Sequence, residues 1–151
     1  FDIHKVKEGE PPPLSDIGKE TSRINATLAA FSPYLAPAWS VEVFNTNPLP
    51  TSTRTAPEDY WVRPSGEQIV VGLFKNDEDD GEYIVVGNRD VGKAHEATLT
   101  FSTKLKTVSR IDKKTRKWDK LQPVAGEKGQ SVKLTVEPGD AELLRVVRPK
   151  T

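Results

Sequence analysis

The sequence predicts a mainly β protein: an antiparallel β-sandwich of about seven or eight strands with an N-terminal helix and a long irregular connection. Two observations carry this prediction. From residue 67 onward, short apolar or β-branched runs recur, separated by polar or glycine-containing turns at spacings typical of sandwiches. No helix-length segment separates these runs, which excludes a parallel sheet with crossover helices. A length of 151 residues suits one domain.

The first 66 residues are predicted to lead into the sandwich. Residues 1–14 are polar and end in three prolines, which favour extended polyproline geometry, so we expect a linker. Residues 15–66 are predicted to form a helix and an irregular connection that packs on the sandwich, and residues 67–151 the sandwich itself. The irregular part is residues 45–66, because four prolines and many hydroxyl residues gather there.

The helix is predicted from a cap and one apolar face. Ser15 and Asp16 offer an N-terminal cap. Ser32-Pro33 is expected to end or kink the helix near Phe31, because a residue that precedes proline avoids the helical conformation. The face itself steps by four and three residues through Ile17, Thr21, Ile24, Leu28, Phe31 and Leu35.

The strands are predicted from apolar runs bounded by turn residues. Two of them alternate apolar and polar residues, which indicates a sheet with one face buried. The alternating positions are Ala97, Leu99 and Phe101 in one run and Val132, Leu134 and Val136 in another. The predicted strands are residues 67–76, 82–90, 95–103, 106–112, 117–124, 130–137 and 141–148, with residues 41–44 as a further candidate.

Composition excludes several classes of function. The chain has 22 Lys+Arg and 22 Asp+Glu, so it lacks the net positive field that recruits nucleic acid or an anionic membrane. It has no Cys, which excludes disulfides and thiol nucleophiles. No apolar run approaches the roughly 20 residues that span a bilayer. The chain opens on Phe1 and has no Met, so we expect it to be a processed or excised piece of a longer protein.

One basic stretch keeps an alternative open. Residues 104–120 carry eight Lys or Arg against two Asp, with Trp118 among them, a pattern that could track a nucleic acid backbone. A single aromatic residue makes no stacking platform, however, and the total charge is zero. The outer face of a hairpin is therefore the favoured interpretation, and neither nucleic acid nor a membrane is expected as a partner.

Two groups of carboxylates are candidates for chemistry. Glu137, Asp140 and Glu142 lie between two apolar runs. Because Pro138-Gly139 provides the residues that a tight turn needs, we interpret these three carboxylates as charged side chains at the end of a hairpin. Among residues 76–82, the acidic side chains could bind Ca²⁺, the one cofactor that the sequence suggests. A solvated hairpin tip is the favoured alternative. The candidate metal ligands are Asp77, Asp79 and Asp80.

No complete catalytic constellation is found in the sequence. His4 and His95 are the only histidines, and neither has the spacing of a metal pair. There is no nucleophile elbow and no phosphate-binding glycine loop. Two carboxylates could still meet in space to act as acid and base, although no spacing singles out a pair.

Aromatic residues are the better candidates for binding. Flat Trp and Tyr rings stack on the apolar faces of sugar rings when they are exposed. The alternative is that these rings close the core or fasten the connection to the sheets. The candidate carbohydrate-binding residues are Trp39, Tyr60, Trp61 and Trp118, with Tyr34 behind them.

The chain resembles the C-terminal β-sandwich accessory domains of bacterial glycoside hydrolases over about residues 20–147. Such domains share a "G-x-F" strand, a hairpin leading to "Y-x-x-V-x-N", an "I-D-x-x-T-G" turn and a final "P-G-D-A-x-L-L". Arg116 stands where the turn usually has Gly, and Val136 where Leu is usual, so we expect that hairpin to be built differently. The matching positions are Gly72-Leu73-Phe74, Tyr83 to Asn88, Val108 to Asp112 with Thr115, and Pro138-Gly139-Asp140 to Leu143-Leu144.

This resemblance implies a non-catalytic domain that supports the catalytic domain of the same parent chain and could contact polysaccharide. It implies a secreted parent, located outside the cell or in the periplasm. It transfers no catalytic residue, because those of the family lie on a separate barrel. Two alternatives stay open: an independent carbohydrate-binding module that uses exposed Trp and Tyr, and a small carboxylate-dependent hydrolase.

Overall fold

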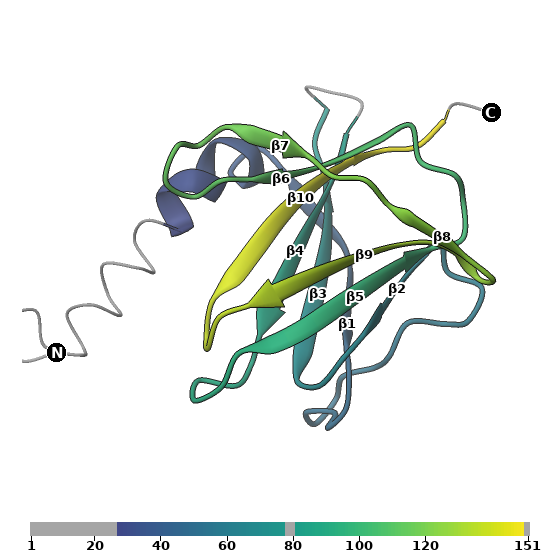
Figure 1. Ribbon diagram of the computed structural model, residues 1–151. Coiled ribbons are helices and arrows are strands. Elements are labelled where there is room, and N and C mark those ends of the chain that lie inside the picture. Colours follow the sequence, from purple (N-terminus) through teal and green to yellow (C-terminus); the bar gives the residue numbers. More distant parts are fainter. Residues whose placement is uncertain (1–26, 78–80, 150–151) are drawn as a thin grey trace, which may run out of the picture.

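The computed structural model describes residues 27–77 and 81–149, and these form one helix and ten strands in two antiparallel sheets (Figure 1). This confirms the predicted mainly β, antiparallel fold. The larger sheet has the order β1-β3-β4-β10-β6-β7 and the smaller has the order β2-β5-β9-β8. The strands are β1 (Trp39–Asn45), β2 (Val62–Ser65), β3 (Ile69–Lys75), β4 (Glu82–Asn88), β5 (His95–Phe101), β6 (Thr107–Ile111), β7 (Trp118–Lys120), β8 (Val124–Gly126), β9 (Gly129–Val136) and β10 (Ala141–Val147).

The main core lies between the two sheets. Every second residue of the inner strands points into it, and each fully buried Leu, Ile or Phe contributes about 1.5–3 kcal/mol to folding. The alternation predicted in β5 and β9 is confirmed, because their inner side chains are buried while Glu96, Lys133 and Thr135 on the other face are exposed. The core includes Phe44, Val62, Val71, Ile84, Leu99, Phe101, Leu134 and Leu144.

The larger sheet has a second core on its outer face. The helix at residues 27–35 lies on this face (Figure 1), where Ala30 and Phe31 pack against Tyr83, Ile111 and Leu143. Strand β4 is therefore buried on almost all of its positions, in contrast to the alternating β5. A strand covered on both faces needs apolar residues at successive positions, which explains the "YIVV" and "LLRVV" runs.

The helix ends one turn later than the sequence predicts. It continues through Pro33 to residue 35, and the Ala36 N–H donates to the Ser32 carbonyl at 2.9 Å. Tyr34 and Leu35 pack against the outer cluster, and this tertiary packing outweighs the hydrogen bond that Pro33 cannot donate. The predicted linker at 1–14 and the predicted helix start at Ser15 lie outside the described residues.

The strand count is also higher than predicted. Strand β2 lies inside the stretch predicted as irregular, since Val62 fills the core and Pro64 is accommodated on an edge strand. The predicted strand at residues 117–124 is two short strands in different sheets, β7 and β8. The sandwich therefore includes strands on both sides of the boundary predicted at residue 67.

The sandwich has two different ends. At one, which we call the crossing end, the chain passes between the sheets three times, from β2 to β3 through residues 66–68, from β4 to β5 through residues 89–94 and from β9 to β10 through residues 137–140. At the other, which we call the rim, β1 and β4 begin and β3 and β10 end, at Trp39, Glu82, Lys75 and Val147. The two ends position different kinds of side chain.

Candidate functional site

A row of side chains crosses the larger sheet at the rim. The strand register places Trp39 opposite Lys75, and Lys75 opposite Glu82. Side chains directly opposite in an antiparallel pair share a face of the sheet. The register thus brings an exposed aromatic ring, a cation and a carboxylate side by side, although their residues are far apart in the sequence.

Glu82 is the centre of an incomplete ion cluster. Arg148 Nη2 donates to its Oε1 at 2.6 Å, and Lys75 Nζ lies 3.2 Å from the same oxygen. The other oxygen, Oε2, is buried and accepts no hydrogen bond from the described residues. Two cations therefore share one oxygen while its twin is left without a donor, an arrangement that costs about 1–3 kcal/mol.

Tyr60 and Trp61 close the core beside this cluster. Trp61 stacks near Phe101 with ring centroids 6.1 Å apart, and the Arg148 guanidinium lies 4.2 Å from the Trp61 ring centre. Tyr60 packs edge-on to Phe44 at 5.0 Å. Both residues line a small pocket of about 60 Å³, together with Val41, Leu73, Phe74, Lys75, Glu82 and Arg148.

The four predicted carbohydrate-binding residues therefore differ in surroundings. Trp39 is 48% exposed at the edge of the sheet, so its ring is available to a ligand. Tyr60 and Trp61 are half-buried against the core, and the faces of Trp61 are largely occupied. Trp118 lies in the outer cluster, edge-on to Tyr34 at 4.9 Å. Three of the four candidate residues lie near the rim. Trp118 instead packs against the outer core, as the alternative to sugar binding predicted.

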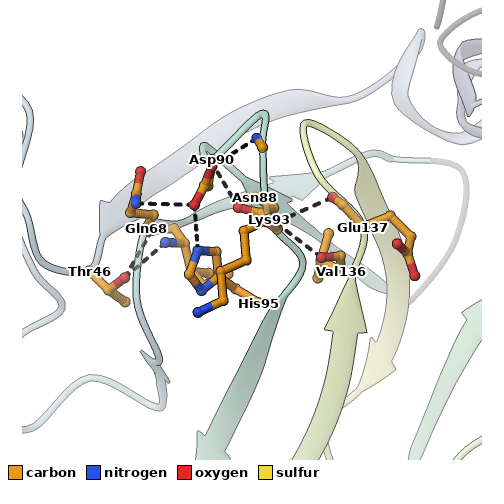
Figure 2. Close-up of polar contacts among 10 residues, drawn as sticks. Thr46, Gln68, Asn88, Asp90, Lys93, His95, Val136 and Glu137 are labelled. Atoms are coloured by element: carbon orange, nitrogen blue, oxygen red, sulfur yellow. Dashed lines mark hydrogen bonds and ion pairs between the residues drawn. The ribbon is translucent and has the colours of Figure 1, made fainter. Parts of the chain in front are cut away.

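The crossing end is held by a polar network (Figure 2). Asn88 is buried, and its Nδ2 donates to the carbonyls of Lys93, Val136 and Glu137 at 2.8, 3.1 and 3.3 Å. Its Oδ1 accepts the Asp90 N–H at 2.8 Å. One amide therefore ties the β4–β5 connection to the end of β9, because a buried amide must satisfy both its donors and its acceptor.

An acid–histidine pair belongs to the same network (Figure 2). His95 Nε2 lies 2.9 Å from Asp90 Oδ2, and Gln68 Nε2 donates to the same oxygen at 3.4 Å. The Gly92 N–H and then His95 lower the pKa of Asp90. No sequence pattern indicated this partner for His95. Among the hydrogen bonds of the described residues, none joins His95 to a Ser or Thr hydroxyl, so no serine triad is assembled.

The carboxylates of the β9–β10 turn have structural partners. The Asp140 N–H donates to the Glu137 carbonyl at 3.0 Å and Gly139 has φ 64°, which confirms the predicted tight turn. Lys113 Nζ contacts Asp140 at 2.8 Å and Glu142 at 3.4 Å. Thr27 of the helix donates to Asp140 Oδ1 at 3.1 Å, so this carboxylate fastens the helix to the sheet.

The pKa values of Asp140 and Glu142 shift in opposite directions. Burial by itself would raise the pKa of Asp140, but hydrogen bonds from Lys113, Ala141 and Thr27 outweigh it and lower that pKa. Burial raises the pKa of Glu142, because its attraction to Lys113 and Arg110 is too weak to compensate. The Lys113 ammonium contacts both carboxylates, so each of them has an ion-pair partner inside the molecule.

Of the three predicted Ca²⁺ ligands, one lies within the described residues. Asp77 is exposed in the turn that follows β3, while Asp79 and Asp80 lie outside the described residues. Among residues 27–77 and 81–149, no group of three His, Asp or Glu side chains is arranged to hold a metal ion. The Ca²⁺ prediction therefore stays untested.

The rim could have been found only in part from the sequence. A polar setting predicted exposure for Tyr60 and Trp61, which are half-buried, while the exposed Trp39 was a candidate only as an aromatic residue. Nothing in the linear order indicated that Glu82 and Arg148, 66 positions apart, would form an ion pair. The "E-Y-I" and "R-P-K" contexts look like ordinary strand ends.

Comparisons of the chain with protein-family models, with curated proteins and with solved structures found no significant match. The described part of the chain contains no helix with the length and apolarity needed to cross a bilayer.

Proposed function

We propose that the chain is a non-catalytic accessory β-sandwich of a glycoside hydrolase-like protein, located outside the cell or in the periplasm. One observation carries this proposal. Several of the residues on which the family resemblance rests have structural roles at or beside the crossing end: Asn88 in the buried network, Asp112 in the β6–β7 turn, and Gly139 and Asp140 in the β9–β10 turn.

The β6–β7 turn supports the same resemblance in detail. Asp112 Oδ1 accepts the N–H groups of Lys114 and Thr115 at 2.8 and 3.0 Å. Arg116 has φ 60°, the left-handed conformation that favours the glycine usual in the family. A glycine would fit the backbone conformation of Arg116, and the expectation that this hairpin is built differently from that of the family stays a prediction.

The role proposed for the domain is to stabilise a catalytic domain of the same parent chain. The domain has two hydrophobic cores, and its helix packs on the outer face of the larger sheet. The test is thermal inactivation of the longer parent protein, compared with the same protein carrying Asn88→Ala in this domain. We expect faster inactivation with an unchanged kcat for the remaining active enzyme. Equal inactivation, or a parent without a catalytic domain, would contradict the proposal.

An independent carbohydrate-binding module is the second candidate. It is favoured by the gathering of Trp39, Tyr60 and hydrogen-bonding charges at the rim. The third, a carboxylate-dependent hydrolase, is less well supported, because Lys113 contacts Asp140 and Glu142 and the pocket beside Tyr60 and Trp61 has a single acid, Glu82.

A further inference from the structure

We propose that the rim is a binding site for neutral polysaccharide, in which Trp39 stacks on a sugar ring and Lys75, Glu82 and Arg148 bond its hydroxyl groups. This goes beyond the supporting role above and does not depend on it. The inference rests on the arrangement of the described rim residues, which the strand register fixes.

The first argument is the exposed platform. Trp39 and Val41 are 48% and 42% exposed, next to one another on an edge strand. An irregularity between Ser40 and Glu42 interrupts the pairing with β3 and leaves Val41 on the pocket wall. Large exposed apolar side chains grouped beside polar ones commonly mark a contact surface. A Trp ring offers the flat face that the C–H side of a pyranose needs.

The second argument is the unsatisfied acceptor. Glu82 is 9% exposed and lines the pocket that Tyr60 and Trp61 border, and its buried Oε2 has no donor among the described residues. Lys75 makes the longer of the two contacts to Glu82, and its side chain is 46% exposed. A small movement of Lys75 would open the carboxylate to a sugar hydroxyl. The hydroxyl would then supply the donor that Oε2 lacks.

The third argument is charge. The described ionic groups at the rim include Lys75, Lys106 and Arg148 as well as Glu82 and Asp77, so both signs are present. A polyanion or a polycation would therefore meet like charges as well as opposite ones. A neutral ligand with many hydroxyl groups uses both kinds of partner, since hydroxyls donate to carboxylates and accept from ammonium and guanidinium groups.

The small volume of the pocket limits how much of a ligand can enter it. The pocket of about 60 Å³ is far smaller than the roughly 300–1,000 Å³ of sites that enclose a ligand. It would admit one hydroxymethyl or hydroxyl substituent while the sugar ring stays outside on Trp39. Such a site fits a ring within a chain as well as a chain end. Weak attachment to an extended polymer is the expected behaviour.

The experiment is affinity electrophoresis of the whole chain through gels containing mixed-linkage β-glucan, xyloglucan or galactomannan, with polygalacturonate as the acidic comparison. We expect at least one neutral polymer to retard the wild type. Trp39→Ala should weaken Kd about tenfold, which corresponds to roughly 1.4 kcal/mol. Trp39→Phe should stay within about threefold of the wild type, and it keeps the test valid where the alanine variant folds poorly.

Val91→Ala is the matched control, because Val91 is 85% exposed but lies at the crossing end. It should bind like the wild type. Monosaccharides added to the gel distinguish binding of chain ends, which they would inhibit, from binding within chains. No retardation by any neutral polymer, equal retardation of Trp39→Ala, or retardation by polygalacturonate alone would overturn the proposal. None of these results would affect the stabilising role, which is measured on the parent protein.

Discussion

The two ends of the sandwich differ in how their charged and polar side chains are engaged. At the crossing end, Asn88, Asp90 and Asp140 each have several partners inside the molecule. Arg89 also donates to two backbone carbonyls there, although its buried Nε has no partner among the described residues. At the rim, Lys75 and Arg148 share one oxygen of Glu82, and Trp39 remains exposed. A polar group with all its bonds satisfied serves the fold, whereas groups with spare bonding capacity are available to a ligand.

This difference separates stability from binding. Substitutions that remove a satisfied polar group at the crossing end should lower the free energy of unfolding and leave the affinity for polysaccharide unchanged. Substitutions at the rim should weaken binding and leave the free energy of unfolding nearly unchanged. The predictions that follow concern the crossing end and the β6–β7 turn beside it, and they run from the largest expected effect to the smallest.

Asn88→Ala should have the largest effect. It removes the amide that joins β4 to the end of β9 and leaves the buried Val136 carbonyl without this donor. We expect a loss of about 2–3 kcal/mol in the free energy of unfolding, measured by urea denaturation. Retardation by a neutral polysaccharide should be unchanged below the unfolding transition. A loss below about 0.5 kcal/mol would show that the network does not hold this end together.

Asp140→Asn should cost about 1–2 kcal/mol at pH 7, because Lys113 and Thr27 lose their ionic partner. The pKa of Asp140 lies below its ordinary 3.8, so its contribution is present above that value and disappears as the pH falls through the folded pKa. The variant and the wild type should therefore converge in stability below about pH 3.8.

Glu142→Gln is the matched control for that prediction. Burial raises the pKa of Glu142, so the charged form is unfavourable in the folded protein and stability is lost as the pH rises through the folded pKa. Removing the charge should therefore raise stability at pH 7 relative to the wild type, the opposite sign to Asp140→Asn. Urea denaturation at several pH values measures both. The same sign for both variants would contradict the assignment of partners around Lys113.

Arg116→Gly should give the smallest effect, a gain of about 0.5–1 kcal/mol. Arg116 is exposed and holds φ 60°, a conformation that glycine adopts without steric cost. The midpoint of urea denaturation should rise while its slope stays constant. A fall in stability would mean that the Arg116 side chain makes a contribution that outweighs the backbone strain.

Local chemistry allowed much of the fold to be predicted. Alternation in β5 and β9 and the Pro138-Gly139 turn depend on neighbouring residues alone, so they were visible in the sequence. The end of the helix and strand β2 depend on tertiary packing of Tyr34 and Val62, which overrode the proline signals beside them. Short strands such as β8 have too few residues to carry a pattern.

The candidate site was less predictable for a related reason. Trp39 was a candidate only as an aromatic residue, because its neighbours Ala38 and Val41 are apolar. The burial of Trp118 depends on a helix more than 80 residues away in the sequence. Glu82 and Arg148 are joined only through the register of β4 and β10. Sites assembled across strands leave little trace in the order of the residues.

The central claim is that this chain attaches to polysaccharide without acting on it. Reducing ends released from mixed-linkage β-glucan, xyloglucan and galactomannan, incubated with the purified chain, test the claim most directly. We predict no release above the buffer control for any polymer, including one that retards the chain in a gel. Release that a single carboxylate substitution, such as Glu142→Gln, abolishes in a folded variant would contradict the account and establish a catalytic role.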